Sequence, residues 1–463
     1  MFKLKEGDML EIGTSQIDVT PELPFPLAGS WHLREATSVN DPLFASCVVT
    51  DNGENSSAFI SCDLLMINNE QVADIRTKIN KVTGIIPENI MVSCTHTHQG
   101  PIMFPLLPFP WILPREKVIK KVLAGIVESA IAANKNKQPA RIGYGKGKTD
   151  KATFNRRYIM KDGHSHMHPP RGGNSERLLV EGPVDPEVQI IWFEDLNGDY
   201  IAILVNFSSH CIVLYDTTLV SADFPGAMRN TIQELLGKNI PILYLQGACG
   251  NTCPIDVENE KRVCTGIEGW KRVGRMVGGE VIKVLAENYV LEKNNITIAT
   301  KNKVLSIPFR EISSNEIIEA KKEWASFTEK DKEELLRARS DFDCPELFVK
   351  SYHDYSIIEL DKIRKAKPHF PVELSVIRLD DVIFVTNPAE LFVEFQLEIK
   401  KRFKDKKVLV VELANGYCGY VPTELALALG GYETERSLGS RLSPEAGRVI
   451  VDDSIELIKN IGI

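Results

Sequence analysis

Two histidines separated by one residue are the first candidates for chemistry in this chain. His96 and His98 come at the end of an apolar run, residues 89–95, that we predict to be a strand, so both side chains should point to the same face. His210 follows a second predicted strand, residues 200–207. Imidazole nitrogen is a common zinc ligand, which makes the three histidines candidates for a metal site. Two core or surface histidines would show the same spacing, so the pattern alone leaves that alternative open.

Glu390 and Tyr420 are weaker candidates when only their spacing is considered. Asn387 could cap a helix that begins at Pro388, and Glu390 would then occupy the third helical position, as in a capping box. Spacing alone therefore favours a helix cap over a metal ligand for Glu390. Tyr420 has the spacing of an ordinary core or surface tyrosine.

Strand-like and helical runs alternate through most of the chain, which is the pattern of an α/β protein. Several polar candidates lie just past predicted strand ends, where α/β proteins tend to bind ligands. A charged segment, about 314–367, is predicted to be mostly helical and holds no obvious site residue. The other predicted strands are residues 43–50, 57–60, 240–245, 373–379 and 382–386, and the predicted helices are residues 70–82, 116–134 and, in the capping interpretation, 388–402.

An apolar segment follows the histidine pair directly. Residues 102–114 contain four prolines, which exclude a regular helix or a central strand. The segment is therefore a loop. It either packs on the core or forms the wall of an apolar substrate pocket.

Five segments, in order along the chain, resemble motifs of the neutral/alkaline (non-lysosomal) ceramidase superfamily, in its catalytic N-terminal domain. Smaller matches at residues 41–43 and 61–64 support them, and the resemblance extends to Tyr432. It therefore covers nearly the whole chain. The five are Thr95–Pro101, like T-H-T-H-S-G-P; Asn155-Arg156, like an N-R pair; Asn206–His210, like N-F-x-x-H; Pro388–Leu391, like P-G-E; and Ala414–Val421, like A-N-x-Y-x-x-Y-V.

The resemblance implies a fold and a set of site residues. The implied fold is one large α/β domain over residues 1–463, with β-sheets flanked by helices and a zinc site in strand-end loops. The implied Zn²⁺ ligands are His96, His210, Glu390 and Tyr420. The residues implied to surround a scissile amide are His98, Arg156 and Tyr432.

The chain also departs from the pattern of that family. A G-D-x-S-P motif supplies a serine near the zinc there, whereas this chain has Gly250-Asn251-Thr252-Cys253-Pro254. Cys253 could act as a thiolate nucleophile, bind zinc or merely fill the space. The family also carries a C-terminal β-sandwich domain. We expect this chain to lack it, because the sequence ends at Ile463, soon after the tyrosine motif.

Three further features invite a functional interpretation. The tract from His164 to His168 suggests a second metal site, but turn residues flank it and favour an exposed or substrate-facing loop. Asp223 precedes a helical run and is predicted to be its N-cap. Cys249 and Cys253 have no second cysteine pair at zinc-site spacing. The nine scattered cysteines are expected to be free thiols.

Composition excludes several partners. The formal charge of −8 argues against a nucleic-acid surface. No apolar run approaches the roughly 20 residues that span a bilayer. The first residues lack the apolar core of a secretory signal. We therefore expect a cytoplasmic protein without a membrane span.

The leading hypothesis is a zinc-dependent hydrolase that uses a metal-activated water to cleave an amide of an N-acylated small molecule. His98 would transfer a proton or stabilise the oxyanion, Arg156 would hold a carbonyl or anionic group, and Tyr432 would donate to the oxyanion. The acyl or other apolar part would lie near residues 102–114. One alternative keeps the zinc site but cleaves an ester, peptide or glycosidic bond. Another is a non-catalytic ligand-binding protein.

Overall fold

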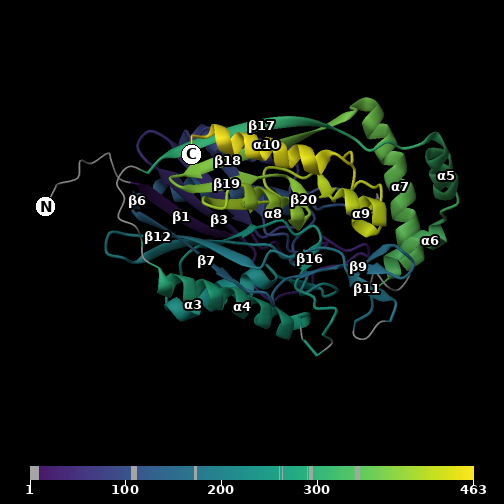
Figure 1. Cartoon of the computed structure of the whole chain (residues 1–463), viewed down its shortest axis with the longest axis horizontal. Coiled ribbons are helices and arrows are strands. Elements are labelled where there is room, and N and C mark those ends of the chain that lie inside the picture. Colours follow the sequence, from purple (N-terminus) through teal and green to yellow (C-terminus); the bar gives the residue numbers. More distant parts are fainter. Residues whose placement is uncertain are drawn as a thin grey trace.

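Three β-sheets surround one central core in the computed structural model (Figure 1). The inner faces of all three contribute to that core, for example through Phe59, Leu204 and Phe384. Helices cover the outer face of each sheet. The α/β class with helix-flanked sheets is thus confirmed. The structure describes residues 10–105, 112–171, 175–259, 261–262, 264–288, 290, 296–338 and 345–462.

The first sheet has the strand order β5-β4-β3-β1-β6, and helices α1 and α2 pack on its outer side. Its β4–β5 pair is parallel, whereas β3 runs antiparallel to both β1 and β4. Apolar residues dominate β5 because the strand is fully buried. The elements are β1 (Glu11–Asp18), β3 (Phe44–Asp51), β4 (Ser56–Cys62), β5 (Ile90–Cys94), β6 (Gln138–Pro139), α1 (Asn69–Thr83) and α2 (Glu116–Lys135).

The second sheet has the order β15-β13-β12-β7 and is covered by α3 and α4, which run along the lower side of Figure 1. Here β13 and β15 form the parallel pair. The elements are β7 (Arg141–Lys148), β12 (Glu187–Glu194), β13 (Tyr200–Phe207), β15 (Ile242–Gln246), α3 (Phe224–Leu236) and α4 (Gly266–Glu287).

The third sheet has the order β17-β18-β19-β21, and α8 and α10 cover it. Its parallel pair is β19 and β21. The elements are β17 (Ile298–Pro308), β18 (His369–Leu379), β19 (Val382–Thr386), β21 (Lys407–Val411), α8 (Val393–Arg402) and α10 (Ala446–Asn460).

Short elements complete the described fold. Helices α5 to α7 lie together at one end of the molecule, on the right in Figure 1. No helix among the residues that the structure describes is long and apolar enough to cross a bilayer. The short elements are β2 (Ser38–Val39), β8 (Phe154–Asn155), β9 (Arg157–Met160), β10 (Ser165–Met167), β11 (Arg177–Val180), β14 (Leu219–Val220), β16 (Thr252–Cys253), β20 (Ala389–Leu391), β22 (Gly419–Val421), α5 (Ser314–Ala325), α6 (Glu329–Arg337), α7 (Pro345–Ala366), α9 (Glu424–Leu429), η1 (Pro87–Asn89) and η2 (Tyr432–Thr434).

Two asparagines of the sequence motifs tie the three sheets together. The Asn206 amide on β13 donates to the carbonyl oxygens of Leu245 and Val410, each at 2.9 Å, so it bridges the second and third sheets. Asn415, just after β21, accepts from Val92 N on β5 at 3.0 Å, which links the third sheet to the first. The motifs therefore include residues that set how the sheets meet.

The predicted strands and the two helices at residues 70–82 and 116–134 are confirmed, but the predicted helix at residues 388–402 begins too early. Asn387 Oδ1 accepts from Ala389 N at 3.1 Å and forms a local turn instead of a helix cap. The next residues form β20, in which Glu390 pairs with Tyr420 of β22, and helix α8 begins only at Val393. The helix-cap interpretation of Glu390 was wrong because pairing with a distant strand prevails over the local pattern.

A buried ion pair joins the first sheet to helix α3. Asp63, just after β4, accepts from both terminal nitrogens of Arg229, at 3.1 and 2.6 Å, and also from Phe44 N at 2.8 Å. Both side chains are buried. Removing the charge of one partner leaves the other charge buried without compensation.

We therefore predict that Asp63→Asn lowers the free energy of unfolding by about 3–5 kcal/mol, measured by urea denaturation. The matched control is Asp74→Asn, which removes an exposed pair with Lys78 and should cost less than about 1 kcal/mol. Equal losses in the two variants would contradict the structural role of the buried pair.

Candidate metal centre

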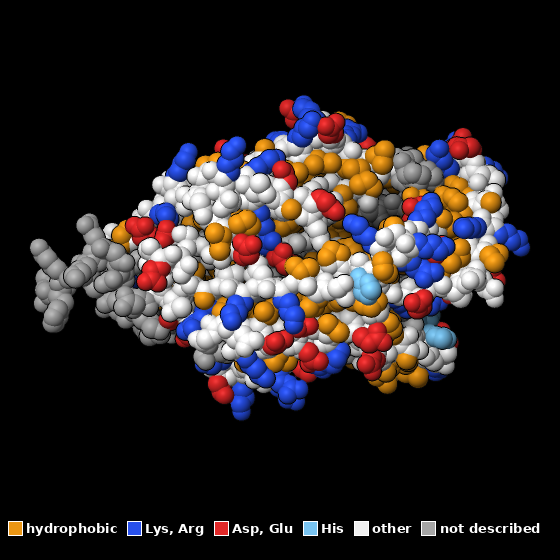
Figure 2. All heavy atoms as spheres, turned by 90° about the horizontal axis from the view of Figure 1, so that it is seen from above, with side chains coloured by type: hydrophobic (Ala, Val, Ile, Leu, Met, Phe, Trp, Pro, Cys, Tyr) orange, Lys and Arg blue, Asp and Glu red, His pale blue; other side chains and the backbone are white. Residues whose placement is uncertain are grey.

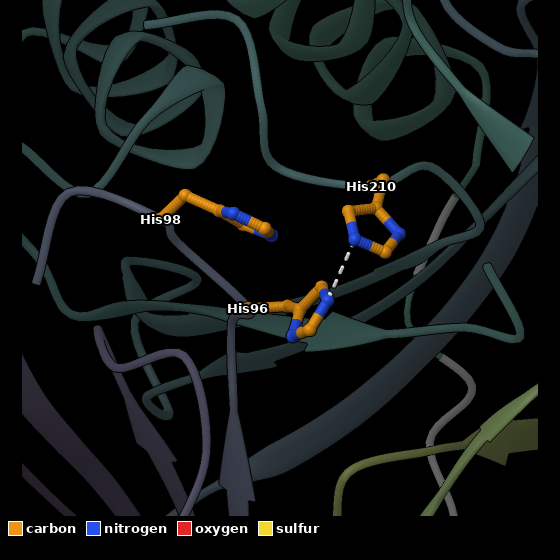
Figure 3. A group of neighbouring side chains, drawn as sticks. All are labelled: His96, His98 and His210. Carbon is orange, nitrogen blue, oxygen red and sulfur yellow. Dashed lines mark hydrogen bonds between the residues drawn. The ribbon is translucent and has the colours of Figure 1, made fainter. Parts of the chain in front are cut away.

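The carboxyl ends of the three parallel strand pairs meet at one place. His96 and His98 follow β5, and His210 follows β13. Glu390 follows β19, and Tyr420 follows β21. Each sheet thus contributes to one cluster, as the strand-end positions predicted. Figure 3 shows the three imidazoles pointing toward one another from two different segments.

The three imidazoles share one hydrogen-bonding pattern, which fixes the ring nitrogen that carries the proton. In each ring Nδ1 lies within hydrogen-bond distance of a main-chain carbonyl oxygen, which can only accept. Nδ1 therefore carries the proton, and Nε2 presents a lone pair. The acceptors are the carbonyls of Leu65 for His96, Gly29 for His98 and Cys249 for His210, at 3.0, 2.8 and 3.2 Å.

Two of these lone pairs face each other across a very short gap. His96 Nε2 lies 2.8 Å from His210 Nε2, the contact drawn as a dashed line in Figure 3. Two lone pairs at that distance repel unless a proton or a cation lies between them. Burial lowers the pKa of His210 well below its ordinary value, which disfavours the proton. The pair therefore fits a metal cation.

The remaining acceptors support the same conclusion. Glu390 Oε2 lies 3.3 Å from His96 Nε2 and 3.9 Å from His210 Nε2. Among the described residues, neither Glu390 Oε2 nor His98 Nε2 has a hydrogen-bond partner, although both atoms are buried. Unsatisfied buried acceptors of this kind require an explanation, and a bound cation provides one. His96, His98 and His210 are close enough together to hold a metal ion.

The charge states fit such a site. Burial, followed by the nearby His96, lowers the pKa of His98 well below its ordinary value, so that ring is neutral. For Glu390, burial raises the pKa, but His96 and the hydroxyls of Tyr420 and Tyr417 lower it, and the net pKa is below the ordinary value. Tyr417 donates to Glu390 Oε1 at 2.8 Å. The centre therefore combines imidazole nitrogens with a carboxylate, a donor set that zinc accepts.

The backbone at His96 supports a specialised role for this residue. Its φ of 67° is in the left-handed region, which non-glycine residues rarely adopt. The conformation is held by a hydrogen bond from His96 N to Leu64 O at 2.9 Å. Strained backbone of this kind is concentrated at functional sites.

Tyr420 and Arg156 lie beside the cluster. Tyr420 pairs in register with Glu390 across β20 and β22. Its hydroxyl accepts from Arg156 Nη2 at 3.2 Å, and the same nitrogen donates to Gly250 O at 2.8 Å. Arg156 is buried, and its Nε donates to Glu433 Oε1 at 2.8 Å. Arg156 is thus anchored on one side and reaches Tyr420 on the other.

A hollow of about 810 Å³, counting the open solvent at its mouth, leads to the cluster. Its walls include His96, His98, Glu390, Tyr420 and Tyr432.

The loop after the histidine pair forms part of that wall. Ile102, Met103 and Ile112 line the hollow and also belong to the core of the first sheet, so packing on the core is confirmed for these residues. Residues 106–111 of the predicted loop lie outside the described part of the chain.

Sequence reasoning missed an aromatic wall opposite this loop. Tyr352 of α7 lines the hollow, and its ring stacks on Trp31 with centroids 6.0 Å apart. Trp31 also lies 5.6 Å from Tyr432. One residue of the segment 314–367, which showed no obvious site residue in the sequence, thus lies in the wall of the hollow, and a single tyrosine in a charged helix gives no signal of such a place.

Cys253 lies outside the hollow. It is absent from the lining residues, its side chain is fully buried, and burial raises the pKa of its thiol to about 12. His168 Nε2 lies 3.2 Å from Cys253 Sγ, and burial lowers the pKa of His168 to about 3. A neutral thiol beside a neutral imidazole fits a packing role better than a nucleophile.

The other features have different outcomes. Residues 165–167 of the histidine tract form β10, so the predicted loop is partly strand, and His166 is exposed and pairs with Asp162. Asp223 caps α3 as predicted, accepting from Phe224 N, and burial raises its pKa to about 6. Eight cysteines are free thiols, and Cys344 lies outside the described residues.

Comparison with known proteins places these features in a family. Residues 11–240 match the family model described as neutral/alkaline non-lysosomal ceramidase, N-terminal. The chain is similar to neutral ceramidase A of Dictyostelium discoideum, with 25% identity over 49% of this chain and 32% of that protein. It is also similar to the neutral ceramidase of Pseudomonas aeruginosa, with 28% identity over 36% of this chain and 24% of that protein. The matched segments therefore span about a third or less of these relatives.

Solved structures share the fold over a longer stretch. The crystal structure of neutral ceramidase from Pseudomonas aeruginosa matches with a TM-score of 0.72 and 16% identity, covering 98% of this chain and 75% of that one. A structure titled ceramidase complexed with C2 matches with a TM-score of 0.71 and 16% identity, covering 97% and 75%. At this identity the likeness establishes the fold alone.

We predict that Cys253→Ser keeps kcat/KM within about threefold of wild type, because the thiol packs against His168 away from the hollow. The measurement is steady-state turnover of a substrate found for the wild type, alongside thiol titration of the folded protein. Loss of turnover by a factor of about 1,000 with normal stability would instead identify Cys253 as the nucleophile.

Proposed function

We propose, because this chain belongs to the neutral/alkaline ceramidase superfamily, that it is a zinc-dependent hydrolase that cleaves the amide bond of an N-acylated small molecule. The observation that carries the proposal is the short contact between His96 Nε2 and His210 Nε2, with the unpaired Glu390 Oε2 beside both atoms. That arrangement favours a cation, and its nitrogen and oxygen donors suit zinc.

The metal would be held by His96, His210, Glu390 and Tyr420. When bound, zinc lowers the pKa of a water molecule and polarises a substrate carbonyl. Main-chain carbonyls orient the two imidazoles, and Tyr417 orients Glu390 through its other oxygen. Such supporting bonds keep ligands in place before a metal arrives.

His98 is the candidate for proton transfer. Its Nε2 is unpaired, its ring lines the hollow, and its bond to Gly29 O fixes the tautomer with a lone pair on Nε2. In amide hydrolysis the water oxygen bonds to the carbonyl carbon, the C–N bond breaks, and the amine nitrogen gains a proton. His98 Nε2 would accept the proton from water and deliver it to the amine.

Tyr432 would act on the oxygen side of the amide. It lines the hollow and lies 5.7 Å, between ring centroids, from Tyr420, and its hydroxyl is a donor, as a developing oxyanion requires. Arg156 is outside the described lining of the hollow, so it would act through the Tyr420 hydroxyl, to which its Nη2 donates, while the Glu433 carboxylate holds its guanidinium.

The lining of the hollow favours a neutral, apolar acyl group. Glu390 is the one carboxylate in the described lining, and lysine and arginine are absent from it. Leu65, Met66 and Ile102 contribute apolar surface next to the histidines. Ceramides and shorter N-acyl amides therefore belong in the first substrate panel, with esters, peptides and glycosides as the test of the other bonds.

The surroundings of this protein are also a proposal. Eight buried free thiols support a reducing compartment, so we propose a cytoplasmic location. Lysine and arginine are interspersed with acidic residues over the face in Figure 2, which supports a small-molecule substrate over a nucleic acid. Fractionation of cells that express the full chain would test the location.

We predict that His98→Ala lowers kcat on an N-acyl amide by about 100- to 10,000-fold while the protein keeps its metal. The measurements are turnover and metal content by mass spectrometry on the same sample. His166→Ala removes an exposed histidine and should change neither value. Loss of the metal in His98→Ala would show that His98 is a ligand and would contradict its proton-transfer role.

We predict that the aromatic wall selects the acyl group. Tyr352→Ala removes the ring that stacks on Trp31 and should change relative kcat/KM across a series of acyl lengths by about tenfold. Tyr352→Phe keeps the ring, loses the hydroxyl with its bonds to Ser437 and the Gly439 backbone, and should change the relative kcat/KM by less than about threefold. Identical chain-length profiles in both variants and wild type would rule out this wall as a selector.

A further inference from the structure

The loop over residues 250–253 contacts three parts of the centre through its backbone. Gly250 N donates to Leu391 O, next to Glu390, at 3.0 Å. Thr252 O accepts from His210 N at 3.1 Å, and Asn251 O accepts from Arg156 N at 2.9 Å. A shift of this loop would therefore move a segment that carries Glu390, another that carries His210, and Arg156.

The Asn251 side chain adds two hydrogen bonds of opposite direction. Its Oδ1 accepts from Val393 N at 2.9 Å, and its Nδ2 donates to Glu394 Oε2 at 2.9 Å. Val393 is the first residue of α8, and Phe392 before it supplies no capping side chain. Asn251 therefore caps α8 from a distant segment, and Glu394 holds the capping amide in place.

The loop and the strand that carries Glu390 are in tight contact. A Cβ placed on Gly250 would lie 2.6 Å from Glu390 O, closer than real Cβ contacts allow. On the other side, the buried Glu412 carboxylate accepts from Leu391 N at 2.6 Å. Strand β20 has only three residues, so these contacts, together with its pairing to β22, fix where Glu390 lies.

We propose that Asn251 and Glu394 form a positioning pair that fixes β20, and through it the Glu390 carboxylate, at the metal centre. One of the two residues, 251 or 394, must carry an amide, because Val393 N–H needs an acceptor and the carboxylate of the other residue needs a donor. An aspartate at position 251 would offer two acceptors. It would leave Glu394 without its donor and bring two carboxylates to about the distance of the present hydrogen bond, where they repel.

An asparagine where the G-D-x-S-P pattern has an aspartate suits this chain, because the amide can donate to Glu394 while it accepts from Val393 N–H. Reversing both members should restore the pair: with Asn251→Asp and Glu394→Gln together, the carboxylate accepts from Val393 N–H and from the new amide. The interaction is then the same with its polarity exchanged.

The test is a double-mutant cycle on the full chain with Asn251→Asp, Glu394→Gln and the combination. Glu398→Gln is the matched control, because Glu398 lies one turn further along α8 and pairs with Arg448. Three quantities are measured: zinc affinity by competition with a chelator, kcat and KM on an N-acyl amide, and amide hydrogen exchange of residues 389–396 in metal-free protein.

We expect Asn251→Asp to weaken zinc binding and lower kcat by about tenfold or more, with faster exchange in residues 389–396. Glu394→Gln keeps an acceptor for the Asn251 amide and should change each value by less than about threefold. The combined variant should return to within about threefold of Glu394→Gln in each value. If the combined variant is no better than Asn251→Asp, the positioning pair is refuted.

The activity readout rests on the proposed function, whereas hydrogen exchange does not. If the wild-type protein bound no zinc and hydrolysed no amide, the proposed function would be refuted. The hydrogen exchange of the wild type and the three variants would still test the Asn251–Glu394 positioning pair. Normal exchange in Asn251→Asp would overturn the inference whatever the activity.

Discussion

The centre depends on one short contact, in which His96 Nε2 and His210 Nε2 lie 2.8 Å apart while Nδ1 of each ring carries the proton. Burial lowers the pKa of His210 and so disfavours a shared proton, and the arrangement fits a bound cation. The carbonyls of Leu65 and Cys249 hold the two rings with their Nε2 atoms facing each other, and each carbonyl belongs to a loop at a strand end. The positions of the strands therefore determine this contact.

The three-sheet architecture meets this demand by placing three parallel strand pairs around one core. No single sheet could bring His96, His210 and Glu390 together, because each follows a strand of a different sheet. Polar cross-links such as Asn206 and Asn415 fix the angles between the sheets. The loop over residues 250–253 then sets the final position of Glu390 relative to the histidines.

Much of this could be predicted from the sequence, and the failures share one cause. Apolar strands and the histidines after them were evident, because burial imposes a local pattern. Glu390 was not assignable by spacing, since it pairs with Tyr420 of a distant strand and its neighbour Leu391 donates to Glu412. Glu433, which holds Arg156, is separated from it by 277 positions and has no local signature. Contacts between distant segments decide roles that local patterns leave open.

The central claim is that His96, His210 and Glu390 hold one metal ion in the natural state of this chain. The most direct measurement is metal content by mass spectrometry of protein purified without added metal, for wild type and Glu390→Ala. We predict about one metal ion per chain in the wild type, zinc under the proposed function, and a large loss in the variant. Wild-type protein that is folded and free of metal, or a variant that keeps its full content, would contradict it.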